Sequence, residues 1–490
     1  MKQLLASTSI FDQLRGWLRS ETVKAKILLL GAVFASAPLL PAQINCTGYL
    51  RLNNNQPMLG ASQGPLVCQY PFSATVLAQA TFGGNADSTL SAQLAAGATP
   101  TTTAVNAALA AQLAQLPTPS AAVGTVSLHL PERDVAEPFS NLGPILTDRP
   151  DTVPRRGYFL SFAYQHFNFT QIDGLSLGAL NFGLMVPGVT VPNGGAGLSG
   201  PFYAGMQNKL SFHLDQYIGL LTIGLSKTTD VSIAVPVNSV SVTTTSSQFS
   251  GFLYTGSTLS QPFIIFAQPG SGNQTPLITS GSATGVGDIT MNVKQMLLGQ
   301  EGRYAVAAGA QFRLPTGDSS NYLGSGAWGA NIFSLIEYRG RLRGIGIAPH
   351  MKVGYQWNGQ SQIMDIQNPP HLSLPGGLDY AFGADFGLYR NLRRARGLTL
   401  SVDGVGHQYV NAPVLTASSV GLPNASSQPG IPSSLPALAQ GTNTYTTFNF
   451  SGGFKVQVQR HVLLFANVLV PITNVGLRSD PVPLVGIGIK

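Results

Sequence analysis

From residue 157 onward, apolar side chains recur at every second position over long segments of the chain. Successive side chains of a β-strand point to opposite faces, so this period predicts strands with one apolar face. In the segment Tyr304–Leu314, for example, Phe312 falls on one face and Arg313 on the other. Each such segment is about as long as a tilted strand that crosses a bilayer, roughly 9–11 residues in the hydrocarbon.

The second face of these segments distinguishes a membrane barrel from a soluble sandwich. A β-sandwich exposes its polar face to water, where Lys and Glu are abundant. Here only 10% of the residues are charged and 56 of 490 are Gly. Gly, Ala, Ser and Asn on the second face are typical of a crowded lumen. Aromatic residues near the strand ends fit the two girdles of a membrane barrel, and they are Tyr158, Tyr338, Trp357 and Tyr380.

The pattern predicts an all-β fold, namely an antiparallel transmembrane β-barrel of about 12 strands (about 10–14). Short and long connections alternate, which favours an even strand number, with short periplasmic turns and long extracellular loops. The longest loops are expected over 170–208, 245–285 and 410–442. The predicted strands lie near residues 157–169, 209–225, 229–244, 286–298, 303–315, 327–339, 343–357, 377–390, 397–409, 443–458, 461–471 and 482–490.

The first 42 residues form a predicted signal peptide. Lys24 and Lys26 precede the apolar run Ile27–Leu40, and small residues follow it. Cleavage is expected after Ala42, because cleavage after Ala37 would leave a proline at the first mature position. The protein is therefore expected to be exported.

Residues 43–150 are predicted to form a separate, partly helical region. Thr103 is suited to cap a helix over 104–116. The apolar positions of this helix form one narrow stripe, and they are Val105, Leu109, Leu113 and Leu116. We favour a periplasmic cap or linker, and the alternative is a plug that inserts into the barrel.

Cys46 and Cys68 are the only cysteines. In an exported chain, two cysteines most simply close one loop by a disulfide. Lipidation of Cys46 is the alternative, but Gln43, Ile44 and Asn45 lack the small residues that such a site requires.

Catalytic and cofactor-binding motifs are missing from the sequence. There is no G-x-S-x-G elbow, H-E-x-x-H pair, P-loop or complete G-x-G-x-x-G. The seven histidines have no metal-ligand spacing, so neither a metal nor a cofactor is predicted. His407 and Asp403 share a strand face, but residues four apart on a strand are separated by about 13 Å. The net charge of +7 is not gathered into a basic stripe, so the sequence predicts neither an enzyme nor a nucleic-acid-binding protein.

Several titratable residues have the parity of the lumen. A charge on the lipid face of a barrel costs about 2–4 kcal/mol near the midplane, whereas lumen charges can pair with one another. The set is either a ladder of charges along a path or a group of interior salt bridges that only stabilise the barrel, and we favour the second for any single member. The lumen-lining candidates are Lys294, Arg313, Glu337, His350, Lys352, Asp379, Asp385 and Asp403.

Two motifs resemble the signature of a known family. Gly285–Ile289 reads G-V-G-D-I, and Leu314–Asp318 reads L-P-T-G-D. Together they resemble outer-membrane transporters associated with the meta-cleavage pathway of phenol degradation. The segment Thr147–Asp151 is similar to the one that leads into that family's first strand. The matching residues are Asp148, Arg149, Pro150, Asp151, Gly285, Gly287, Asp288, Pro315, Thr316, Gly317 and Asp318.

The resemblance implies an outer-membrane barrel, and it covers residues from Thr147 to the end of the chain. The terminal Lys490 departs from the aromatic residue with which such barrels usually end. A barrel of this size has a largely filled lumen, so a narrow or gated path is expected. We therefore expect passive uptake of small, largely apolar or aromatic compounds across a bacterial outer membrane.

Membrane lipid and a small solute are the expected partners, and the oligomeric state is left open. The alternatives are a non-conducting surface barrel that binds or adheres through its long loops, and a secreted β-sandwich.

Overall fold

The computed structural model describes the barrel and parts of the region before it. The chain divides into Met1–Gln43 and Ile44–Lys490, and every described residue belongs to the second unit. The predicted signal peptide lies outside the described residues, and so does Cys46 of the predicted Cys46–Cys68 disulfide. The described residues are 66–68, 105–106, 109–111, 113–114, 116, 126–128, 137–139, 141–191, 198–255, 258–264, 277–299, 302–343, 345–361, 363, 373–389, 397–425, 431–458 and 461–489.

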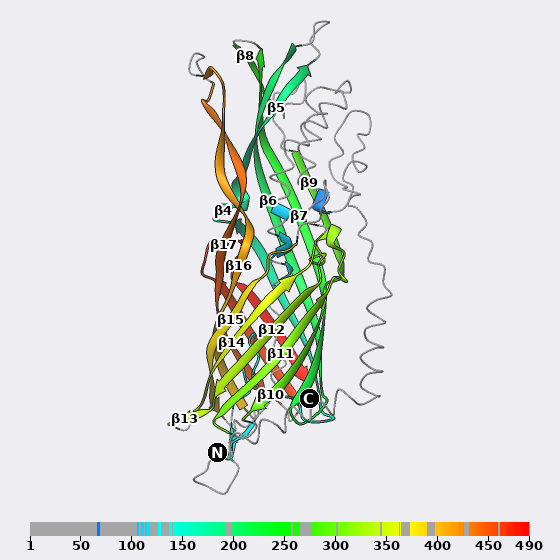
Figure 1. The fold of residues 1–490 in the computed structure, drawn as a ribbon, viewed down its shortest axis with the longest axis vertical. Helices are drawn as coiled ribbons and strands as arrows, with labels where there is room; N and C mark the ends of the chain where they lie inside the picture. The colour runs from blue at the N-terminus through cyan, green and yellow to red at the C-terminus, as the bar shows by residue number, and fades with distance from the viewer. Residues whose placement is uncertain are drawn as a thin grey trace, which may run out of the picture. The chain divides into compact units, whose positions relative to one another are not determined.

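One antiparallel sheet closes on itself to form a barrel (Figure 1). β20 pairs with β3, so that Ile489 lies opposite Leu160, and β10 pairs with β7. Closure leaves no free edge in the wall, as a bilayer requires. In the described part of the chain the twelve wall strands are β3 (Tyr158–Ile172), β6 (Leu198–Gly224), β7 (Thr229–Thr255), β10 (Ile289–Leu298), β11 (Tyr304–Leu314), β12 (Gly329–Tyr338), β14 (Ile345–Asn358), β15 (Gly377–Tyr389), β16 (Gly397–Gly421), β17 (Ser434–Gln457), β18 (Val462–Pro471) and β20 (Val482–Ile489).

The predicted barrel of about 12 strands is confirmed, and each predicted strand overlaps one wall strand. The alternative of a β-sandwich is wrong, because a single closed sheet surrounds the interior. The shorter elements are β1 (Val126–Leu128), β2 (Glu137–Phe139), β4 (Leu175–Ser176), β5 (Leu180–Val191), β8 (Thr258–Ile264), β9 (Leu277–Val286), β13 (Gly340–Leu342), β19 (Leu477–Ser479), η1 (Leu66–Cys68), η3 (Leu177–Ala179) and η4 (Ser319–Asn321).

Three connections that we expected to be long loops contain strands. β6 and β7 continue as a paired hairpin far beyond the predicted strand ends, and so do β16 and β17. Segment 245–250, the start of one expected loop, explains part of the error, because it is rich in Ser and such a composition is typical of loops. The segment is nevertheless paired with β6, where Thr245 lies opposite Lys209 and Ser246 opposite Asn208.

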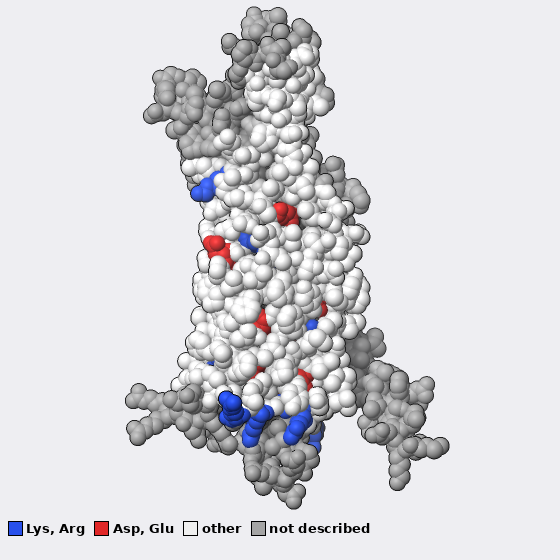
Figure 2. Space-filling model, turned by 90° about the vertical axis from the view of Figure 1, so that its left-hand side faces the viewer, with Lys and Arg blue, Asp and Glu red and all other residues white. Residues whose placement is uncertain are grey.

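The outer surface of the barrel is apolar. On β12, Ile332 is 61% exposed while its neighbour Phe333 is 2% exposed. Figure 2 shows a wall with few charges, below which Lys and Arg side chains gather at the rim. The short connections carry exposed basic residues, among them Arg303, Arg341 and Arg343. An apolar band of this extent is stable only in contact with lipid.

Among the described residues, no helix combines the length and the apolar character that crossing a bilayer would need.

Candidate functional site inside the barrel

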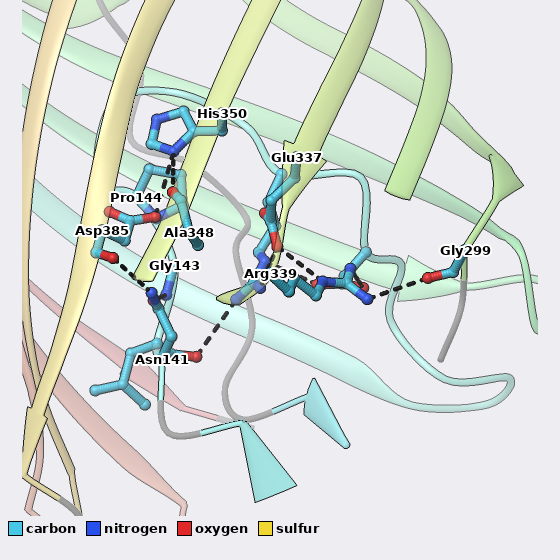
Figure 3. Close-up of polar contacts among 12 residues, drawn as sticks. Asn141, Gly143, Pro144, Gly299, Glu337, Arg339, Ala348, His350 and Asp385 are labelled. Carbon is cyan, nitrogen blue, oxygen red and sulfur yellow. Dashed lines mark hydrogen bonds and ion pairs between the residues drawn. The ribbon is translucent and has the colours of Figure 1, made fainter. Parts of the chain in front are cut away.

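Residues 141–153 enter the barrel before β3 begins, and we call them the lumenal loop (Figure 3). Near its start, Asn141 Nδ2 donates to the backbone oxygen of Asp385 at 3.1 Å. At its end, the Val153 N–H donates to Asp230 Oδ2 at 3.0 Å. These contacts join the loop to β15 and β7, which lie on different sides of the wall. The loop therefore crosses the lumen near the end with short connections.

The centre of the lumenal loop is held by four side chains that we call the arginine network. Arg149 Nη2 donates to Glu337 Oε1 at 2.8 Å, and Arg149 Nε lies 2.8 Å from Asp151 Oδ2. Arg339 contacts the same two carboxylates at 2.9 and 2.5 Å. Both arginines and Glu337 are fully buried, with 0% of each side chain exposed. Two positive and two negative charges balance, which a buried ion pair needs in order to be tolerated.

Burial opposes the charge on Arg149, but attraction by Glu337 and Asp151 outweighs it. The pKa of the Arg149 guanidinium therefore lies above its usual range, and the loop carries a permanent charge into the lumen.

His350 on β14 holds the neighbouring part of the loop. Its Nε2 lies 2.9 Å from Thr147 Oγ1 and 2.8 Å from Asp403 Oδ1. Its Nδ1 lies 3.1 Å from the backbone oxygen of Ala348 (Figure 3). With a carbonyl at one ring nitrogen and a carboxylate at the other, the site suits a protonated imidazole that donates from both.

Three lysines contact the loop as well. Lys294 Nζ donates to the backbone oxygen of Arg149 at 3.1 Å, and Lys455 Nζ donates to that of Pro144. Lys352 Nζ lies 4.0 Å from the Asp148 carboxylate. Of the eight lumen-lining candidates, six thus contact the lumenal loop, and they are Lys294, Glu337, His350, Lys352, Asp385 and Asp403.

The other two candidates lie elsewhere in the interior. Arg313 Nη1 donates to the backbone oxygen of Ala114 at 2.5 Å, and its Nη2 donates to Asn358 Oδ1 at 2.8 Å. Asp379 on β15 accepts hydrogen bonds from His407 Nδ1 and Asn331 Nδ2.

Ala114 belongs to the inner segment, which we define as the described residues of 105–116. Most of its apolar stripe is deeply buried, with Val105 1% and Leu109 2% exposed. These side chains pack in one cluster with inward-facing residues of β3, β6 and β7. Asn106 Oδ1 also accepts a hydrogen bond from the Tyr322 hydroxyl at 2.5 Å. The inner segment thus lies inside the barrel, which differs from our favoured interpretation of a periplasmic cap.

The motifs Gly285–Ile289 and Leu314–Asp318 are hydrogen-bonded to each other where β9 ends and β10 begins. Thr316 Oγ1 donates to the backbone oxygen of Gly287 at 2.7 Å. The N–H of Gly317 donates to Asp288 Oδ1 at 3.1 Å, and the N–H of Ser325 donates to Asp288 Oδ2 at 2.8 Å. A Cβ on Gly317 would lie 2.7 Å from the Cα of Gly324. Glycine is therefore needed where the L-P-T-G-D loop passes close to its own return.

The remaining motif residues shape the same turn. Asp318 caps η4, since its Oδ1 accepts the N–H of Ser320 at 3.0 Å. Pro315 follows the last residue of β11, and Gly285 is the penultimate residue of β9.

On two wall strands the inward faces change from polar to apolar along the barrel axis. On β3 the buried residues run from Ser161 and Gln165 to Phe167 and Phe169. On β16 they run in the same direction from Ser401 and Asp403 to Tyr409 and Leu415. On β18, by contrast, Leu463 and Phe465 are buried near the end with short connections.

A cavity of about 200 Å³ lies between the inner segment and the lumenal loop, and we call it the central cavity. Leu116 and Thr147 line it from these two segments. The wall contributes Lys352 and Asp379 among the lumen-lining candidates, together with residues that were not predicted. These unpredicted polar residues are Gln311, Asn331, Gln356, His407, Thr447, Asn449, Arg478 and Ser479.

Arg339 and Lys455 were not predicted from the sequence to contact the loop. Arg339 follows the predicted inward residue Glu337 by two positions. Lys455 lies two positions after Gly453 and therefore on the same face of its strand. Strand parity was therefore the available signal for both residues. Arg478 had no such signal, because it lies in a connection that we expected to be a loop.

Comparison with known families decides the relationship. Residues 221–419 match the family model described as "Putative MetA-pathway of phenol degradation". The family resemblance is confirmed. The matched segment contains the motifs Gly285–Ile289 and Leu314–Asp318 and does not include the lumenal loop.

Solved structures of bacterial membrane proteins are similar to this chain at low identity. An outer membrane channel of Pseudomonas putida F1 has 11% identity and a TM-score of 0.36, over 69% of this chain and 97% of its own. A FadL homologue of Pseudomonas aeruginosa has 9% identity and a TM-score of 0.25, over 68% and 88%. The translocator domain of the autotransporter NalP from Neisseria meningitidis has 8% identity and a TM-score of 0.25, over 68% and 88%. The chain matches none of the curated proteins with which it was compared.

The closed barrel with its apolar outer wall is a β-barrel of the bacterial outer membrane. Its interior and its family match support a transport role. Within the described residues, no group of three or more His, Cys, Asp or Glu side chains is placed to hold a metal ion.

Proposed function

We propose that this barrel mediates passive uptake of small, largely apolar compounds, aromatic ones among them, across the outer membrane. The central cavity, which is lined by Phe167, Phe169 and Leu469 beside the polar contacts of the lumenal loop, is the observation that carries the proposal. An apolar solute would enter at the end with long connections and reach the central cavity. The family match supports a transport role and does not identify the solute.

The apolar part of the cavity lining supplies contacts that an apolar solute can use in place of water. Phe167, Phe169 and Leu469 line the central cavity. Burial of apolar surface contributes about 25 cal/mol per Å², so even a small ring gains a useful fraction of its binding free energy. The phenyl rings of Phe167 and Phe169 lie 5.8 Å apart and nearly parallel, with an interplanar angle of 8°.

The lumenal loop would act as the gate near the end with short connections. It is held by hydrogen bonds and ion pairs with several wall strands, and these contacts can break and reform. Passage of a solute then requires displacement of the loop and not rearrangement of the wall. The contacts of Glu337, Lys294 and His350 with the loop support this role.

Solute flux into liposomes tests this function. Purified barrel is reconstituted, and swelling is followed with neutral aromatic and aliphatic solutes of increasing size. The proposal predicts swelling above that of empty liposomes, faster for benzyl alcohol than for a sugar of similar size. Swelling that is equal with and without the protein would contradict it.

A non-conducting barrel that binds through its hairpins is the second candidate. The long paired extensions of β6 with β7 and of β16 with β17 favour it, because they form an ordered surface beyond the wall. A barrel of this kind would show no flux in the same liposomes.

A further inference from the structure

Within the part of the chain that the structure describes, Arg478 is a buried cation without an acidic partner. It lies on β19, is 6% exposed and lines the central cavity. Its Nη2 donates to the backbone oxygen of Phe448 at 3.1 Å and to Asn449 Oδ1 at 2.7 Å. Its Nε has no hydrogen-bond partner. Among the described residues, no carboxylate lies within ion-pairing distance of this guanidinium.

A buried guanidinium that lacks an anion is costly. For Arg149 and Arg339 this cost is offset, because the two guanidiniums share two carboxylates. The pairing that is routine for the other buried arginines is therefore missing at Arg478. An anionic ligand would supply it.

The other charges of the central cavity are already engaged. Asp379 accepts hydrogen bonds from His407 and Asn331. Lys352 lies 4.0 Å from Asp148 and 4.4 Å above the ring of Phe333. The uncompensated charge in the cavity is therefore positive.

Apolar side chains stand beside this charge. Ser479, the residue after Arg478, is paired in register with Phe169 of β3. Phe167 and Leu469 line the same cavity. The site thus presents a guanidinium next to aromatic and aliphatic surface.

We propose that the central cavity binds a small organic monocarboxylate, with the carboxylate on Arg478 and the apolar body against Phe167 and Phe169. A guanidinium presents several donors in a planar fork that matches a carboxylate. This inference deepens the proposed function, because it names a class of solute for the same lumen. Only the entry of the solute rests on that function, while binding can be measured without flux.

The test compares benzoate with benzyl alcohol, which keeps the ring and lacks the charge. Binding to detergent-solubilised barrel is measured by calorimetry, and flux of each solute is measured in liposomes. The variants are Arg478→Gln, which removes the charge and keeps an amide donor, and Arg478→Lys, which keeps the charge. Lys209→Gln is the matched control, since Lys209 is exposed and also loses one positive charge. Heat-modifiable migration on a gel verifies that each variant forms a closed barrel.

We expect Arg478→Gln to weaken benzoate binding about tenfold or more, since hydrogen bonds to charged groups are the strong ones. Benzyl alcohol should be unaffected, Arg478→Lys should restore most of the benzoate affinity, and Lys209→Gln should behave as the wild type. Equal losses for both solutes would overturn the inference in favour of a structural role for Arg478. Unchanged benzoate binding would overturn it as well.

The two proposals fail separately. If benzyl alcohol crosses the liposomes while Arg478→Gln leaves benzoate binding unchanged, the carboxylate site is wrong and transport stands. If benzoate binding depends on Arg478 while no solute crosses, the site stands and transport is wrong.

Discussion

The guanidinium of Arg149 donates to the carboxylate of Glu337 at 2.8 Å, although 188 residues separate them and neither side chain is exposed. This pair fastens the lumenal loop to the wall strand β12. The same ion pair therefore contributes to the stability of the barrel and holds the loop that a solute would have to displace.

Replacing Glu337 should loosen the gate. Glu337→Gln leaves two buried guanidiniums with only Asp151 as an acidic partner, and removing one member of a buried pair costs roughly 3–5 kcal/mol. We expect faster flux of neutral solutes in liposomes. The matched control is Asp480→Asn, an exposed acid beyond β19, which should leave flux unchanged. A flux in Glu337→Gln equal to that of the wild type would count against the loop as gate.

Replacing Asp288 should weaken the wall itself. Its carboxylate accepts hydrogen bonds from Gly317 and Ser325 and lies 3.7 Å from Arg313 Nε. Hydrogen bonds to a charged group contribute ~1.5–3 kcal/mol. We expect Asp288→Asn to lower the temperature at which the barrel loses its heat-resistant gel migration. Asp318→Asn removes the exposed acid of the L-P-T-G-D motif and should lower this temperature less than Asp288→Asn does.

The inner segment should depend on its buried stripe. Leu109 is 2% exposed, and truncating a buried leucine to alanine costs about 2–5 kcal/mol. Leu109→Ala should therefore raise hydrogen exchange in the inner segment while the wall strands stay protected. Equal protection of the inner segment in the variant and the wild type would contradict the packing described here.

The wall of the barrel could be predicted from the sequence more fully than its interior. Period-two alternation is a local property, so all twelve strands could be predicted. The stripe Val105–Leu113 was also visible, but the surface on which it packs was not. Arg149 was singled out within a motif and Glu337 as a lumen-lining residue, but their pairing becomes apparent only after the barrel has closed. Arg478 is a single arginine in a short strand, and no pattern in the sequence marks it.

The turn between β3 and β4 should make stability depend on pH. Burial raises the pKa of Asp173, although the N–H groups of Leu415 and Gly476 partly oppose this shift. The folded state then holds its proton more tightly than the unfolded state, where Asp titrates near ~3.9. Stability should consequently fall as pH rises from that value through the raised pKa of Asp173.

Asp173→Asn removes this titration. The free energy of unfolding of the variant, measured by urea titration in detergent, should vary less with pH over that range. The same pH dependence in the variant and the wild type would show that another group is responsible.

A reversible lock on the lumenal loop tests the central claim most directly. Arg149→Cys and Glu337→Cys are combined and joined by a reducible thiol-specific cross-linker, with the wild-type chain treated in the same way as the control. The account predicts that liposome flux of benzyl alcohol falls to that of empty liposomes when the loop is cross-linked and returns on reduction. Equal flux in the cross-linked and the reduced protein would contradict a solute path gated by this loop.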